Sequence, residues 1–284
     1  MPMNPHRSVL ITGCSSGIGF ACAQGLARRG WLVVASARRA GDVERLRSEG
    51  LTAVRLDLDD PESIASGLAE ALTHTRGRLD ALFNNGAYGQ PGAVEDLTRD
   101  TLRAQLETNL LGWHDLTCRV IPIMRRQGSG RIVQNSSILG LIALPYRGAY
   151  VASKFALEGL TDTLRLELRD SGIQVSLIEP GPILSRFRVN AHRAFKAHMD
   201  PETSVHREAY RRAEERLSKV GPAQPFTLPP EAVLRVLIHA LESARPKARY
   251  HVTVPTHLLG LFRRVLPTRG MDWLLRRVSG DGAR

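Results

Sequence analysis

The chain has 284 residues, of which 43% are hydrophobic and 24% are charged, a composition typical of a soluble globular protein. Its three scattered cysteines lack metal-binding spacing, and a chain this long buries a sizeable core unaided, so we expect neither a disulfide framework nor a metal site. With only eight residues before the first apolar run, and no run of about 20 apolar residues, we expect a cytoplasmic protein. The net charge of +11 is compatible with a site for anions, but the scattered arginines favour a solvated mixed surface.

Short apolar runs alternate with helical patterns through the first 180 residues. Strands are expected at residues 9–11, 32–34, 54–56, 81–83, 131–135 and 175–178, and helices at 18–29, from 61 onward, at 97–126 and at 150–169. This alternation predicts an α/β fold with a doubly wound, mostly parallel sheet of about seven strands and helices on both faces. In such sheets ligands bind beyond the carboxyl ends of the strands, where the unusual residue clusters of this chain fall.

The pattern changes after residue 182. Residues 183–229 are rich in Arg, His and Pro, and we expect them to form irregular helices that cover a substrate site. A helix is expected at 230–242, an edge strand at 250–254, and two short arginine-bearing helices at 257–266 and 271–278. Without repeats or a linker, residues 1–284 are expected to form one domain. The amphipathic extension at 256–284 either contacts a membrane surface peripherally or packs on the protein body or on a second subunit.

A glycine-rich segment, Thr-Gly-Cys-Ser-Ser-Gly-Ile-Gly at residues 12–19, joins the first predicted strand to the first helix. Glycines allow a tight turn and close approach of a ligand, and a helix N-terminus offers free N–H groups and a positive dipole end to a phosphate. The strand–turn–helix context favours a dinucleotide site over a purely structural turn.

The end of the second strand bears on the choice of cofactor. Enzymes that use NAD commonly place an acidic residue there, whereas residues 35–39 read Ala-Ser-Ala-Arg-Arg. Arg38 is suited to bind a 2′-phosphate, with Ser36 or Arg39 assisting, although an exposed arginine pair is the plainer alternative. The missing acid predicts NADP(H).

Tyr150 and Lys154 lie four residues apart in a predicted helix and therefore share a face. A free tyrosine has a pKa of about 10, and a nearby ammonium lowers it toward the range of an efficient base. The chain has only four lysines, against 35 arginines, so a lysine at this position suggests a need for a compact ammonium. The pair therefore predicts proton transfer.

These motifs together resemble the short-chain dehydrogenase/reductase family. The resemblance rests on the glycine segment, on Tyr-x-x-x-Lys at 150–154, on Ser137 at the usual spacing before Tyr150, on Asn-Asn-Gly-Ala at 84–87 and on Pro-Gly-Pro-Ile at 180–183. The family pattern at 84–87 is Asn-Asn-Ala-Gly, so the last two residues are exchanged here. Residues 136–160 are most similar to the subgroup of 17β-hydroxysteroid and retinol dehydrogenases, which implies bulky apolar substrates.

The resemblance implies a Rossmann-type sheet and a set of site residues. Tyr150 would transfer the proton, Lys154 would assist it, Ser137 (in preference to Ser136) would orient the substrate oxygen, and Asn109 would hold a relay water. The implied cofactor contacts are Gly13, Ser15, Ser16, Gly17, Ile18, Gly19, Arg38, Asp57, Leu58, Asn85, Gly86, Tyr150, Lys154, Pro180, Gly181 and Ile183.

We therefore expect an NADP(H)-dependent oxidoreductase that transfers hydride between the nicotinamide and a carbonyl or alcohol, on a bulky apolar aldehyde, ketone, retinoid or steroid-like substrate. The alternative is an NADPH-binding sensor without chemistry, which would leave the Ser137, Tyr150 and Lys154 set unexplained. Nucleic acid is not an expected partner, because only the net charge suggests it. A homo-oligomer is compatible with the sequence.

Overall fold

The computed structural model describes residues 7–219, 221 and 225–279. In this part of the chain, seven strands form one sheet in the order β3-β2-β1-β4-β5-β6-β7, and every neighbouring pair is parallel. The strands are β1 (Ser8–Ile11), β2 (Leu32–Ala37), β3 (Thr52–Arg55), β4 (Ala81–Asn84), β5 (Gly130–Asn135), β6 (Ile173–Glu179) and β7 (Arg249–His251). The predicted doubly wound, Rossmann-type sheet is confirmed.

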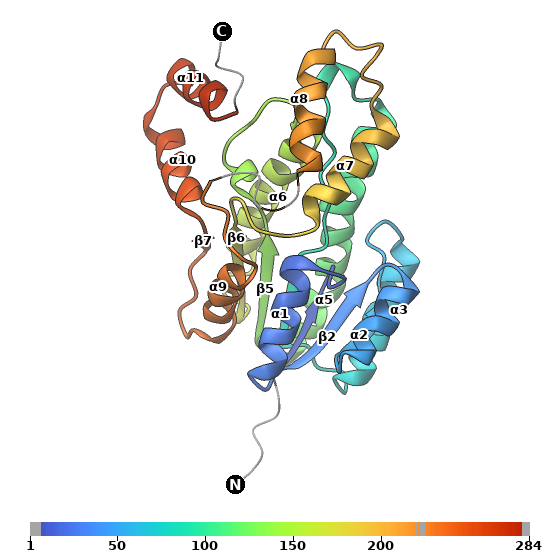
Figure 1. The fold of residues 1–284 in the computed structure, drawn as a ribbon. Helices are drawn as coiled ribbons and strands as arrows, with labels where there is room; N and C mark the ends of the chain where they lie inside the picture. Colours follow the sequence, from blue (N-terminus) through green and yellow to red (C-terminus); the bar gives the residue numbers. More distant parts are fainter. Residues whose placement is uncertain (1–6, 220, 222–224, 280–284) are drawn as a thin grey trace.

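The helices cover both faces of this sheet (Figure 1). They are α1 (Gly17–Arg28), α2 (Ala40–Ser48), α3 (Pro61–His74), α4 (Arg99–Leu106), α5 (Gly112–Gln127), α6 (Gly148–Glu167), α7 (Phe187–His198), α8 (Arg207–Ser218), α9 (Glu231–Glu242), α10 (Val254–Val265) and α11 (Thr268–Ser279). One apolar core lies between the sheet and α1, α2 and α9, and a second lies between the sheet and α3, α5 and α6. Burial of apolar surface in these two layers is the main source of stability.

The strand order reverses between β1 and β4, the two strands that pair at the centre of the sheet. The connections after β1 and β4 leave in opposite directions there, which opens a crevice at the carboxyl ends of the strands. Three short segments border this crevice or its surroundings: the 3-10 turns η1 (Val94–Asp96) and η3 (Ile138–Gly140), and a π-helical turn η2 (Glu107–Leu111).

Several elements differ from the sequence prediction. The helix α2 was not predicted, because its pattern is short and highly polar. The single helix expected at 97–126 is divided by η2 into α4 and α5. The expected irregular helices between 183 and 229 include two regular twelve-residue helices, α7 and α8. The edge strand is shorter than expected, because α10 already begins at Val254. Within the described residues, no helix is long and apolar enough to span a membrane.

Candidate active site

The loop between β1 and α1 requires its glycines. Gly13 has φ +70°, and a Cβ placed there would lie 2.5 Å from the Cα of Gly86. A Cβ on Gly19 would lie 2.3 Å from the carbonyl oxygen of Gly13. Ser16, the N-cap of α1, makes no side-chain capping bond, so the N–H groups of the first turn point into the crevice without a capping side chain. This arrangement fits the pyrophosphate of a dinucleotide.

A hydrogen-bond network ties this loop to the ends of β4 and β5. The Thr12 hydroxyl accepts bonds from the backbone N–H groups of Asn85 at 2.8 Å and Gly86 at 2.9 Å. The Asn85 side chain donates to the Thr12 carbonyl at 2.9 Å and accepts from the Asn135 amide at 2.9 Å. Thr12 and Asn135 were not among the predicted site residues. Because Gly86 lies directly against Gly13, the exchanged Gly86-Ala87 order keeps a small residue at this contact.

Arg38, Asp57 and Leu58 lie beside the expected adenosine end of the site. Arg38 follows β2, its side chain is 59% exposed, and its guanidinium lies 3.9 Å from the carboxylate of Asp59. Asp57 accepts a bond from the backbone of Asp59, and Leu58 is buried close to Gly86. Burial raises the pKa of Asp59, which the sequence analysis did not single out. An acidic group therefore stands near Arg38 after all, contributed by the loop after β3.

The sequence analysis also considered Ser36 and Arg39 as partners of the 2′-phosphate. Ser36 is fully buried in β2 and Arg39 is the N-cap of α2. The sequence analysis missed Arg45, which reaches from α2 to the carbonyl oxygen of Ser15 at 2.7 Å and places its charge beside the glycine-rich loop. Recognising α2 from its charged residues and the following Gly50 would have indicated this contact.

Tyr150 lies in the first turn of α6, and the neighbouring Ser137 side chain favours its phenolate and so partly offsets the effect of burial on the pKa of Tyr150. Ser137 is the N-cap of η3, where its oxygen also accepts from the backbone of Leu139 at 3.1 Å. Ser136 instead lies against Glu158 and the position of Gly140, away from Tyr150. The geometry therefore favours Ser137 over Ser136 as the partner of the phenol.

Lys154 is fully buried one turn further along α6. Its ammonium donates to the carbonyl oxygen of Asn135 at 2.9 Å and lies 4.2 Å from the centre of the Trp113 ring. Burial lowers the pKa of Lys154 to about 7 and raises the pKa of Tyr150 to about 12. The shift at Tyr150 is opposite to that expected from a neighbouring ammonium, because desolvation outweighs the stabilisation of the phenolate by Ser137. Trp113, missed by the sequence analysis, is fully buried beside Lys154 and donates to the carbonyl oxygen of Gly86 at 2.7 Å.

Asn109 lies in the π-helical turn η2, which interrupts the single helix expected at 97–126. Its side-chain oxygen accepts from the backbone N–H of Tyr88 at 3.2 Å, and its nitrogen donates to the Tyr88 carbonyl at 2.9 Å. The same nitrogen lies 3.3 Å from the hydroxyl of Ser153. The side-chain amide thus fixes the loop after β4 against α6, and a relay water held by Asn109 stays a prediction.

The segment after β6 forms the opposite wall. The carbonyl of Pro180 accepts from Ile138 at 2.8 Å, and a Cβ on Gly181 would lie 2.1 Å from the Thr253 hydroxyl. Ile183 pairs with residue 228 in an isolated parallel bridge. Phe187, at the start of α7, packs edge-on against Tyr150 with ring centres 5.3 Å apart. The chain therefore folds back over the phenol with an aromatic side chain that the sequence analysis did not identify.

One cavity of about 580 Å³ connects the glycine-rich loop with the tyrosine. The predicted residues that line it are Gly13, Ser15, Ser16, Gly17, Ile18, Asn85, Gly86, Ser137, Tyr150, Lys154, Pro180, Gly181 and Ile183. Gly19, Arg38, Asp57, Leu58 and Asn109 lie outside it. An uncapped helix end and a buried phenol in one cavity suit a bound dinucleotide that reacts beside a proton donor.

The comparisons with known proteins agree with this geometry. The pattern of the short chain dehydrogenase family matches residues 7–195. The uncharacterized oxidoreductase YbbO of Escherichia coli is 44% identical over 271 residues, covering 95% of this chain and 94% of the relative. Human retinol dehydrogenase 8 is 34% identical, covering 87% of this chain and 82% of the relative, and human 17-beta-hydroxysteroid dehydrogenase type 1 is 33% identical, covering 86% and 77%.

Solved structures show the same fold. A short-chain dehydrogenase/reductase from Burkholderia phymatum, in complex with NAD, has a TM-score of 0.77 at 25% identity and covers 97% of both chains. An actinorhodin polyketide ketoreductase with NADPH has a TM-score of 0.72 at 26% identity, covering 90% of this chain and 99% of that chain. The chain therefore belongs to the short-chain dehydrogenase/reductase family, as an oxidoreductase acting on CH–OH or C=O groups with a nicotinamide cofactor.

Proposed function

We propose that the protein is an NADP(H)-dependent oxidoreductase for bulky apolar carbonyl compounds and the corresponding alcohols. The observation that carries the proposal is the buried Tyr150 hydroxyl beside Ser137, in the same cavity that the glycine-rich loop lines. A binding protein without chemistry has no need of a buried phenol aligned in this way. The non-catalytic sensor therefore remains the weaker alternative.

The side chains divide the work of a reduction. The bound cofactor supplies the hydride. The Ser137 hydroxyl holds the carbonyl oxygen next to Tyr150, which gives its proton to that oxygen as negative charge develops there. Lys154, held by the Asn135 carbonyl, supplies positive charge beside the phenol and binds the nicotinamide ribose. In the oxidative direction Tyr150 accepts the alcohol proton, and a water at Asn109 relays protons toward Lys154.

The preference for the phosphorylated cofactor rests on Arg38. A carboxylate at the end of β2 would repel a 2′-phosphate, and residues 35–39 carry none. Arg38 is largely exposed and makes only a long ion pair with Asp59, so its guanidinium is available to a phosphate. Gly13, Ser15, Ser16, Gly17, Ile18, Gly19, Asp57, Leu58, Asn85, Gly86, Pro180, Gly181 and Ile183 complete the proposed cofactor contacts.

The apolar substrate class is supported by the cavity wall and by the relatives. Leu139, Leu144, Leu184 and Phe187 line the cavity around Tyr150. The named relatives include dehydrogenases of retinol and of a hydroxysteroid. We further propose that residues 1–284 act as one catalytic domain, in which residues 183–229, including α7 and α8, cover the substrate.

The test compares the parent protein with Tyr150→Phe on a panel of aldehydes, ketones, retinoids and steroids, each with NADPH and NADH. We expect turnover with NADPH, and a fall of about 10²–10⁴-fold in Tyr150→Phe, since that is the usual contribution of a positioned acid or base. Ser137→Ala should lose activity while still binding NADPH. Full turnover by Tyr150→Phe, or tight NADPH binding without consumption of any carbonyl by the parent, would refute the catalytic assignment.

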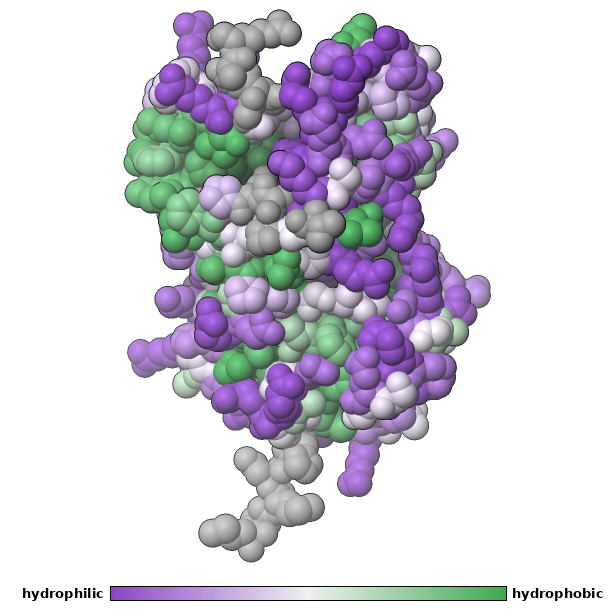
Figure 2. Space-filling view, in the orientation of Figure 1, coloured by the Kyte–Doolittle hydropathy of each residue, from purple (hydrophilic) through white to green (hydrophobic). Residues whose placement is uncertain are grey.

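The C-terminal helices suggest a peripheral contact with an anionic membrane. Their inner face packs on residues 138–144, through Leu259, Met271 and Leu275. The outer face of α10 exposes a stripe formed by Val254, Leu258, Leu261 and Val265, and Figure 2 shows apolar side chains gathered there. The exposed arginines Arg263, Arg264, Arg269, Arg276 and Arg277 complement negative lipid headgroups.

Co-sedimentation with phosphatidylserine-containing vesicles tests this contact. We expect the parent protein to pellet with anionic vesicles, and the double variant Leu258→Ser, Leu261→Ser to stay in solution. Leu166→Ser, at an exposed leucine on α6, is the matched control and should behave as the parent. Equal sedimentation of all three proteins would remove the membrane contact and leave this stripe as a candidate contact between subunits.

A further inference from the structure

Basic side chains predominate among the charged residues that line the described part of the cavity. Among the described residues that line it, six are basic (Arg147, Lys154, Arg186, Arg188, Arg212 and Arg216) and none is acidic. Lys154 belongs to the proton-transfer set. Arg186 lies at the cofactor end, because its backbone nitrogen and the neighbouring Ser185 stand within 4.0 Å of the Cβ position of Gly17. The other basic side chains have no part in the proposed reaction.

Arg147 stands at the substrate end of the cavity. It is the N-cap residue of α6, three positions before Tyr150, and its backbone forms an isolated bridge with Gly92, away from the glycine-rich loop. Within the described residues its guanidinium has no ion pair or side-chain hydrogen bond. Burial, together with the positive charge of Arg216, lowers the pKa of Arg147 to about 9. The guanidinium is therefore largely surrounded by protein atoms, and Arg147 lines the cavity.

Arg249, in contrast to Arg147, has acidic partners among the described residues. Arg249 in β7 lies between the carboxylates of Glu158, Asp162 and Glu179, which raise the pKa of Arg249. Three acids thus compensate the desolvation of one guanidinium there. Desolvating a charge without a partner is costly, so a persistently unpaired guanidinium in a ligand cavity indicates a partner that arrives with the ligand.

The cavity wall formed by α8 combines apolar and basic side chains. On α8, Ala209, Arg212, Ala213, Arg216 and Leu217 all line the cavity, and their spacing of three and four residues places them on one helix face. This face brings apolar surface and positive charge to the cavity wall. The helix is anchored over the site by Tyr210, whose hydroxyl accepts from the backbone of Ala93 at 2.9 Å.

We infer that the substrate of this site is an amphiphile, with an apolar body that presents its carbonyl to Tyr150 and with an anionic oxygen group, a carboxylate or phosphate, that pairs with Arg147. The inference rests on the proposed reductase activity and narrows its substrate class. Neutral retinoids and steroids would fill the apolar part of the cavity and leave Arg147 unpaired.

The test compares ω-oxo fatty acids of increasing chain length with their methyl esters, which present the same aldehyde without the charge; a third arm uses ω-oxoalkyl phosphates. For the parent protein with NADPH we expect kcat/KM to be about tenfold to hundredfold higher for the acid or the phosphate than for the ester, the worth of one or two charge-assisted hydrogen bonds. The better anionic arm identifies the headgroup.

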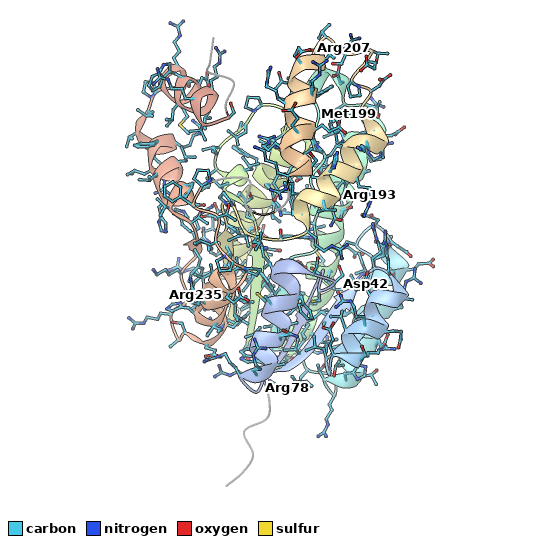
Figure 3. The ribbon with its side chains drawn as sticks, viewed as in Figure 1. Asp42, Arg78, Arg193, Met199, Arg207 and Arg235 are labelled. Carbon is cyan, nitrogen blue, oxygen red and sulfur yellow. The ribbon has the colours of Figure 1, made fainter. Side chains whose placement is uncertain are left out.

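Two variants of Arg147 and one control variant show whether Arg147 causes the preference for the acid over the ester. Arg147→Gln should reduce the acid-to-ester ratio toward one by lowering kcat/KM for the acid alone, and Arg147→Lys should restore part of it. Arg235→Gln is the matched control, because Arg235 is exposed on α9, away from α8 (Figure 3), and should keep the parent ratio. An ester reduced as well as the acid by the parent, or equal losses on both in Arg147→Gln, would overturn the inference.

A binding measurement separates this inference from the proposed activity. Calorimetric titration of the NADPH-loaded full chain with a saturated fatty acid and its methyl ester needs no turnover. We expect tighter binding of the acid by the parent and equal binding of both by Arg147→Gln. If no aldehyde is reduced but this difference is found, the proposed reaction fails and the anion site stands. If acid and ester bind equally to the parent, the anion site fails.

Discussion

Replacement of Arg38 by Gln should weaken NADPH binding and leave NADH binding unchanged. A hydrogen bond to a charged group contributes about 1.5–3 kcal/mol. The Arg38 side chain is 59% exposed, and its guanidinium already lies 3.9 Å from the carboxylate of Asp59. Because solvent and Asp59 both weaken its attraction for a phosphate, the lower end of this range applies. About 1.5 kcal/mol corresponds to roughly a tenfold rise in the Kd for NADPH.

Asp59 provides the opposite perturbation. Its carboxylate stands beside Arg38, and a 2′-phosphate bound there would feel its repulsion. Asp59→Asn should therefore tighten NADPH binding about twofold to fivefold, the worth of a weak exposed charge interaction. In the double variant the benefit of Asp59→Asn should shrink, because the phosphate has lost its arginine partner.

Fluorescence titration of the full chain with NADPH and with NADH measures all of these effects. The exposed Arg235→Gln on α9 serves as the control for loss of one positive charge. Higher salt should reduce the difference between the two cofactors, since the contact is exposed. Equal losses for NADPH and NADH in Arg38→Gln, or a parent protein that binds NADH as tightly as NADPH, would refute the assignment of Arg38.

Three other perturbations have defined outcomes. Gly13→Ala should lower the free energy of unfolding by about 2 kcal/mol or more in urea titrations, because Gly13 has φ +70° and closely contacts the turn after β4. Gly30→Ala is the control for backbone strain without a steric clash, because Gly30 has φ +84° and open space around it. Lys154→Met should lower kcat by about 10²–10⁴-fold in the steady state, and Lys154→Arg should not rescue it, because a planar guanidinium does not fit between Trp113 and the Asn135 carbonyl. Arg249→Met should lower the free energy of unfolding by about 3 kcal/mol, as expected when a buried ion cluster loses its cation. Burial already raises the pKa of Glu158 to about 7, so the folded state holds a proton that the unfolded state releases. Stability contributed by that proton is present at low pH and is lost as pH rises through 7, so the Arg249→Met defect should be larger at about pH 8 than at about pH 5; an equal defect at both would contradict the buried cluster.

The part of the fold that repeats a simple pattern could be predicted from the sequence. Short apolar runs that alternate with helical periods imply parallel strands with crossover helices, and this places every residue after a strand at one edge of the sheet. For that reason the glycine-rich loop, Asn85, Ser137 and Tyr150 were expected to meet, and the cavity joins them.

Residues that reach the site from the side of the sheet could not be predicted in this way. Trp113 and Phe187 come from helices whose periodicity shows that they have a packed face but not what that face contacts. Arg45 depends on α2, whose polar sequence gives little hydrophobic periodicity. Asp59 approaches Arg38 only through the return of the chain after β3. These contacts join segments that are distant in sequence, so no local pattern records them.

The sequence by itself determined that Tyr150 and Lys154 share a helix face, because residues one helical turn apart do so wherever the helix lies. The tertiary structure decided how these groups are charged. Burial of Tyr150 and Lys154 moves the pKa of the phenol up and that of the ammonium down, against the local expectation, since desolvation depends on everything packed around the pair. Tertiary packing also placed Arg147 in the cavity with no acidic partner in the described part of the chain, because the neighbours of a buried charge come from segments that are distant in sequence.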